Sequence, residues 1–154
     1  MVVTLTSTTE RRHVPRPGAV TRTAQPGAVG RVVGSLFLWT SGIHVGLVAA
    51  DTERYRAFAD GALPFVREAW SDVFMAHPAL WGLAVALGEL LIGLATLQGG
   101  RWTVLGLSGA IAFHLCLMLF GWGFWLWSVP VLAVLVPAAL RQAWPARAGG
   151  PQWK

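Results

Sequence analysis

The sequence predicts an all-α fold, a polytopic membrane four-helix bundle with short amphipathic helices in the extracytoplasmic link between helices 1 and 2. Hydrophobic residues make up 55% of the 154 residues and charged residues only 12%, whereas a soluble domain is about a quarter charged. Four stretches also approach the roughly 20 apolar residues that cross a hydrocarbon core of about 30 Å. Together these observations predict one integral membrane domain.

The predicted spans cover residues 32–50, 78–97, 103–122 and 124–140. Gly121 and Gly123 lie where the last two spans meet, and glycine permits the tight reversal that two separate spans require. Residues 31–144 then form the membrane domain. The polar residues 1–30 are expected to be a disordered cytoplasmic tail, and residues 145–154 a second cytoplasmic tail.

The link at residues 51–77 has a helical period, with apolar residues on one face before Pro64 and on another face after it. Asp51 is a candidate cap for the first piece, and Pro64 suits the first turn of the second. We expect two short amphipathic helices at the outer membrane surface or over the mouth of the bundle. They either cover the bundle or close over a cavity that opens outward.

Charge predicts the orientation, because Lys and Arg favour the cytoplasmic side. With four spans, most basic residues fall on one side: Arg11, Arg12, Arg16, Arg22, Arg31, Arg101, Arg141, Arg147 and Lys154. The link carries more acids than bases, so both termini are expected to be cytoplasmic in an integral cell membrane protein. The basic N-terminus is expected to meet anionic lipid and not nucleic acid, since no nucleic-acid-binding signature accompanies it.

Three ionisable residues fall inside predicted spans, where such a group costs roughly 3 kcal/mol or more and usually faces a bundle interior. At 1.5 Å per residue, Glu89 lies about 16 Å below the outer surface, His114 about 16 Å above the inner one, and His44 about 18 Å above it. The three side chains are therefore expected to converge. Candidate residues to line a pocket around them are Trp39, Tyr55, Phe113 and Trp122.

Such a cluster fits several kinds of chemistry. It can bind the polar head of a quinone or similar lipid-soluble ligand, or relay protons. Imidazole and carboxylate also ligate metals, but His44, Glu89 and His114 lack local spacing such as ExxH, so neither a metal nor a bis-imidazole haem is favoured. The structural alternative is a Glu–His hydrogen bond that only locks helices together. No nucleophile with a base and no phosphate loop is visible, so catalytic residues stay unassigned.

The segment Ala86–Arg101, ALGELLIGLATLQGGR, resembles the second-helix motif of the DoxX-like family of membrane proteins, with a membrane Glu, spaced glycines and a short basic turn. The resemblance implies four spans with cytoplasmic termini in a bacterial inner membrane. It also implies a link to quinone-coupled electron transfer or to membrane redox and thiol stress complexes. Glu89 matches the motif residue, whereas His44 and His114 have no counterpart in the general pattern.

The leading hypothesis is therefore a DoxX-like, redox-associated subunit whose pocket binds a quinone-like or other apolar ligand. It would be part of a membrane oxidoreductase, with the lipid bilayer and a redox partner protein or a homo-oligomer as partners. A second hypothesis is a small proton-coupled transporter in which Glu89 alternates between a proton and a cationic substrate. A third is a structural assembly factor.

Overall fold

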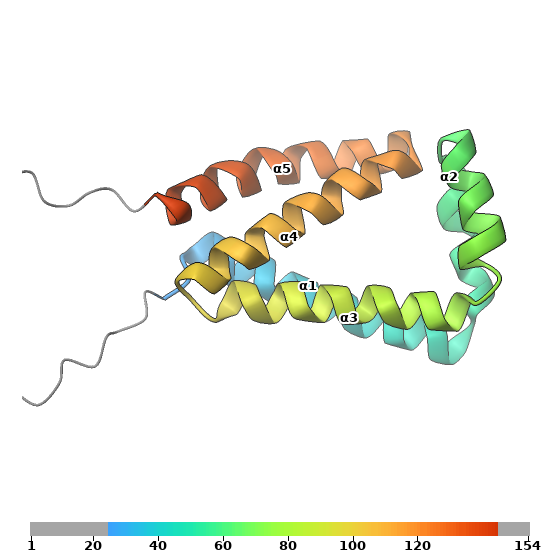
Figure 1. Ribbon diagram of the computed structural model, residues 1–154, viewed down its shortest axis with the longest axis horizontal. Helices are drawn as coiled ribbons and strands as arrows, with labels where there is room; N and C mark the ends of the chain where they lie inside the picture. Colours follow the sequence, from blue (N-terminus) through green and yellow to red (C-terminus); the bar gives the residue numbers. More distant parts are fainter. Residues whose placement is uncertain (1–24, 145–154) are drawn as a thin grey trace, which may run out of the picture.

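Four long helices make up most of the fold (Figure 1). The computed structural model describes residues 25–144, and within that range it contains no strand. The long helices are α1 (Ala28–Ala50), α3 (Pro78–Leu97), α4 (Arg101–Leu117) and α5 (Trp122–Ala143). Each is long and apolar enough to cross a membrane, α4 together with the turn that follows it. The predicted all-α four-helix membrane fold is confirmed.

The helix bounds differ from the predicted spans by a few residues. The second predicted span coincides with α3, but α1 begins at Ala28, inside the predicted N-terminal tail. A helix can extend beyond its apolar stretch because its hydrogen bonds join backbone groups, which explains the earlier start. The third span ends early: after α4 comes a 3₁₀ turn, η3 (Met118–Phe120), and Trp122 opens α5. The rest of the predicted tails, residues 1–24 and 145–154, lies outside the described residues.

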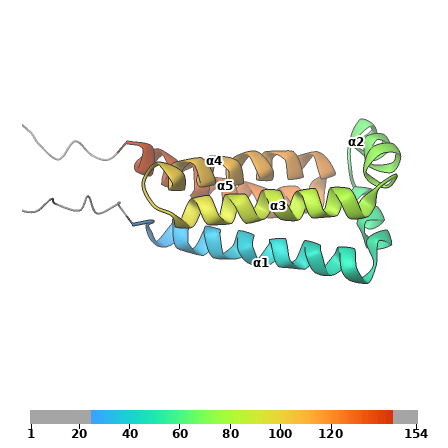
Figure 2. The same ribbon diagram turned by 60° about the horizontal axis from the view of Figure 1, so that its bottom comes forward.

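The segment between α1 and α3 forms what we call the lid, residues 52–74. It consists of a 3₁₀ segment, η1 (Thr52–Ala59), the short helix α2 (Pro64–Ala69) and a π-type turn, η2 (Trp70–Phe74). Asp51 Oδ1 accepts a hydrogen bond from the Glu53 backbone N–H at 3.0 Å, and Pro64 occupies the first turn of α2. Figures 1 and 2 show the lid across one end of the bundle, opposite the start of α1 and the end of α5.

The helices pack in a chain of neighbours. α1 packs most extensively on α3, α3 on α4 and α4 on α5, whereas α1 and α5 hardly touch. Gly34 and Gly93 allow α1 and α3 to approach closely, since a Cβ at either glycine would lie 3.0 Å from the carbonyl oxygen of the other. In Figure 1 the α1–α3 pair and the α4–α5 pair diverge toward the lid.

The lid is attached to the turn between α4 and α5. The Leu63 backbone N–H donates to the Leu119 carbonyl at 3.1 Å. Gly121 reverses the chain with φ +99, a conformation that glycine adopts without strain, and a Cβ there would collide with the Gly61 carbonyl. Gly121 therefore serves both the chain reversal and the seating of the lid.

This dual role predicts that Gly121→Ala lowers the free energy of unfolding by more than about 1–3 kcal/mol, because the backbone at φ +99 and ψ −168 is accessible essentially to glycine alone and the added Cβ also collides with the lid. The control is Gly123→Ala, since a Cβ at that helical position meets nothing within 4 Å. It should leave stability unchanged or raise it by up to about 1 kcal/mol. Reversible unfolding in detergent micelles measures both. Equal effects would show that the turn does not depend on Gly121.

Candidate functional site

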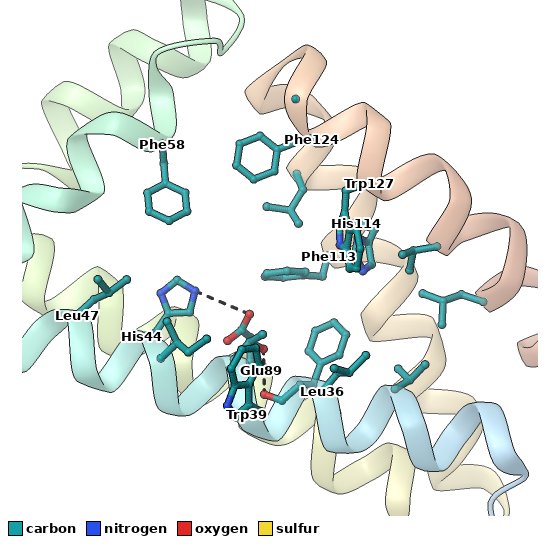
Figure 3. Close-up of a pocket in the computed structure, with 18 residues that line it drawn as sticks. Leu36, Trp39, His44, Leu47, Phe58, Glu89, Phe113, His114, Phe124 and Trp127 are labelled. Atoms are coloured by element: carbon teal, nitrogen blue, oxygen red, sulfur yellow. Dashed lines mark hydrogen bonds and ion pairs between the residues drawn. The ribbon is translucent and has the colours of Figure 1, made fainter.

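A cavity of about 770 Å³ lies between α1 and α5, with side chains of α3 and α4 behind it (Figure 3). Its walls are mainly aliphatic and aromatic, and Phe58 of the lid reaches its outer end. The polar side chains that line it are Thr40, His44, Glu89 and His114. A mostly apolar cavity of this size with a few polar groups is typical of a small-molecule site.

Glu89 is directed at α1 by the helical period of α3. Gly82, Ala86 and Gly93, which share its face, are small and buried, so α1 packs closely over this stripe. The Glu89 side chain is 4% exposed, and its Oε1 lies 3.9 Å from His44 Nε2. The Thr40 hydroxyl lies beside the same carboxyl but donates to the Phe37 carbonyl at 3.2 Å. Glu89 Oε2 is buried and has no hydrogen-bond partner among the residues that the structure describes.

Tyr55 of the lid holds the His44 side chain in place. Its Nδ1 lies 2.9 Å from the Tyr55 hydroxyl, which also donates to the His44 carbonyl at 3.3 Å, and the two rings stack with centroids 5.7 Å apart. When the phenol donates its hydrogen bond to that carbonyl, the His44 Nδ1–H donates to the phenol oxygen. Nε2 then carries no proton and faces the Glu89 carboxyl. At 3.9 Å the two groups are too far apart for a direct hydrogen bond.

His114 forms the polar group on the other side of the cavity. It is 6% exposed, and its Nδ1 lies 3.3 Å from the hydroxyl of Ser128, a fully buried residue of α5. Figure 3 shows His44 and Glu89 on one side of the view and His114 on the other, with the Phe113 ring drawn between them. The three predicted residues thus line one cavity, but His114 bonds to Ser128 and not to Glu89.

The remaining predicted lining residues fall into three groups. Trp39 and Phe113 line the cavity. Tyr55 lines instead a smaller chamber of about 140 Å³ between the lid and the bundle. Trp122 lines neither and is 70% exposed, which corrects its assignment: as the first residue of α5 it points away from the bundle.

Several residues of the site escaped the sequence analysis. Thr40 precedes His44 by one helical turn and so shares its face, a signal that could have been read. Ser128, which holds His114, is a polar residue in an apolar span and could also have been noted. Phe58 and Phe124 could not, because their rings meet only when the lid folds back, with centroids 6.4 Å apart.

A metal site finds no support in this geometry. Within residues 25–144, no three His, Cys, Asp or Glu side chains come together in a group that could hold a metal ion. The metal alternative for His44, Glu89 and His114 therefore has no assembled set of ligands in the part of the chain that the structure describes.

Comparisons with known proteins leave the family open. No family model matches the chain, and no solved structure matches it. The Ciliated left-right organizer ZP-N domains-containing protein of Mus musculus is 40% identical over 83 residues, which cover 50% of this chain and 10% of that protein. Because the chain spans about a tenth of that relative's length, the match shows no family. The resemblance to DoxX-like proteins stays a prediction.

The contact between Tyr55 and His44 predicts a pH dependence of stability. Burial raises the pKa of the Tyr55 phenol above its ordinary value of 10.0, and the charge of Glu89 adds to the rise. The unfolded chain therefore releases this proton at lower pH than the folded chain. The stabilising contribution is complete below pH 10 and is lost as pH rises through the folded pKa.

We expect the free energy of unfolding to fall more steeply above pH 10 in the wild type than in Tyr55→Phe. Tyr55 is the only tyrosine of the chain, so tyrosinate absorbance follows this group alone. A phenol that ionises at the same pH in folded and denatured protein would contradict its burial against His44.

Proposed function

We propose that this chain is a DoxX-like, redox-associated membrane subunit that binds a quinone-like ligand in the cavity between α1 and α5. The observation that carries the proposal is the buried carboxyl of Glu89: the residue lines the cavity, and its Oε2 has no hydrogen-bond partner among the described residues. A buried polar atom without a hydrogen bond costs about 1–3 kcal/mol. A ligand that donates a hydrogen bond there, such as the hydroxyl of a quinol, would remove that cost.

The distribution of polar groups supports a ring with oxygens on opposite edges. Glu89 and His44 reach the cavity from the α1–α3 pair, whereas His114 reaches it from α4. The rings of Phe37 and Phe113 pack edge to face with centroids 5.4 Å apart, and each ring also lies edge to face with the His114 ring. Aromatic edges and faces suit a flat ring, and the polar groups suit its two oxygens.

The pair of His44 and Glu89 supports a role in proton exchange as well as in binding. A quinol that is oxidised gives up two electrons and two protons. The carboxylate of Glu89, 3.9 Å from His44 Nε2, is placed to take up one proton from a hydroxyl in the cavity, and the imidazole of His114, which lines the same cavity, is the acceptor for the second. The electrons need an acceptor, which we assign to a redox partner protein, so this chain acts as a binding and proton-accepting subunit.

Charge at the two ends of the bundle supports cytoplasmic termini in a cell membrane. Arg31, Arg101 and Arg141 lie at the end away from the lid. In the lid, Arg56 pairs with Glu53 at 3.0 Å, and Arg54 lies 3.5 Å from Asp51, so basic charge there is partly neutralised. The positive-inside rule then assigns the lid to the extracytoplasmic side.

Glu89→Gln should weaken binding of decyl-ubiquinol about 10- to 100-fold, because a hydrogen bond to a charged acceptor contributes about 1.5–3 kcal/mol. Equilibrium binding to the purified protein in lipid nanodiscs measures this. The matched control is Glu68→Gln in the lid, an exposed acid that should bind like the wild type. Binding that does not depend on Glu89 would refute the proposal. Proton release driven by an apolar cation, lost in Glu89→Gln, would favour the transporter instead.

Glu89→Met should abolish binding and yet raise the free energy of unfolding by about 1 kcal/mol, since it removes a buried acceptor that has no partner. Thermal unfolding without ligand measures the change. A loss of several kcal/mol would identify Glu89 as a structural clamp, as in the assembly-factor hypothesis.

A further inference from the structure

The cavity is an elongated groove. Its residues on α1 recur every three or four positions, from Val33 through Leu36 and Thr40 to Leu47. This stripe covers about 21 Å at 1.5 Å per residue. On α5 a matching stripe runs from Phe124 to Leu135. The groove therefore runs parallel to the helices, the direction in which the chains of membrane lipids also run.

The groove is open along its side. Leu36, Trp39 and Trp127 line it and yet are 48%, 66% and 62% exposed, because α1 and α5 hardly touch. Glu89, on the inner wall, is only 4% exposed. A path thus leads from the lipid-facing surface between two tryptophans to a buried carboxyl.

The space between the lid and the bundle is much smaller than the groove. The chamber beneath the lid measures about 140 Å³, which is the size of a benzene-binding cavity and too small for a long chain. Phe58, Phe113 and Phe124 border both this chamber and the groove. The hydrogen bond from Leu63 to Leu119 keeps the lid seated on the far side.

We infer that the groove between α1 and α5 is a lateral portal, which holds the apolar chain of a membrane-dissolved ligand while its polar ring reaches Glu89. The inference rests on the proposed function and names the ligand class: a ring with a long alkyl or polyprenyl chain. Such a chain exchanges lipid neighbours for equally apolar side chains, so its transfer from the bilayer into the groove costs little. The partnerless Glu89 Oε2 supplies the specific attraction that an ordinary acyl chain lacks.

Two photoreactive decyl-benzoquinols test the portal in nanodiscs. One carries a diazirine at the chain end and the other carries it on the ring. We expect the chain probe to label α1 around Leu36 and Trp39 and α5 around Trp127. Labelling by both probes should be competed by unlabelled decyl-ubiquinol and should fall at least about tenfold in Glu89→Gln.

Variants at the entrance give a second readout. Trp39→Ala combined with Trp127→Ala should shift the chain label away from α1 and α5 while the ring label stays dependent on Glu89. The matched control is Trp122→Ala, which removes an equally exposed tryptophan of α5 that does not line the groove, and its labelling pattern should match the wild type.

The outcomes separate the two proposals. A chain label on Tyr55, Phe58 or Trp70 with a ring label that still requires Glu89 would overturn the portal and leave the proposed function standing. Ring labelling that is unchanged in Glu89→Gln would overturn both the portal and the proposed function. Chain labelling of α1 and α5 that is not competed would show that ordinary lipid fills the groove. Cross-links between two chains across this face would show that a second copy covers it, and either result rejects the portal.

Discussion

The close packing of α1 on α3 is the constraint from which the site follows. Gly34 and Gly93 bring the two backbones together, and Glu89, on the same face of α3, is thereby buried against α1 next to His44. The second pair, α4 and α5, is joined to the first mainly through α3 and α4, so α5 remains apart from α1. One tight contact and one sparse contact therefore create a cavity with an acid on its inner wall.

Much of this could be read from the sequence, for identifiable reasons. Apolar length predicted the four spans because a bilayer imposes that length on any crossing helix. Counting residues along the spans placed His44, Glu89 and His114 at similar depth, and all three line one cavity. Depth is a property of a single helix, and local sequence determines it well.

Depth along a helix predicts neither the direction in which a side chain points around the helix axis nor its contact partners on other helices. His114 turns to Ser128 on α5, which leaves Glu89 without the imidazole contact expected from that side. Tyr55 reaches His44 only because the lid folds back over the bundle. Trp122 was misplaced because the sequence assigned it to the end of the third span, whereas it is the exposed first residue of α5. Each of these features depends on contacts between segments that are distant in the chain, and apolar periodicity does not report such contacts.

The attachment of the lid has a mechanical consequence. The two helix pairs are joined at one end by the short Gly99–Gly100 connection and at the other by the hydrogen bond between Leu63 and Leu119. Between these two ties α1 and α5, which hardly touch, can move apart only by bowing. Lateral pressure in a bilayer varies with depth and lipid composition, and it would act directly on that bowing. The width of the opening between α1 and α5 would thus depend on the physical state of the surrounding lipid. The same chain would then bind its ligand at different rates in thick, ordered bilayers and in thin, fluid ones.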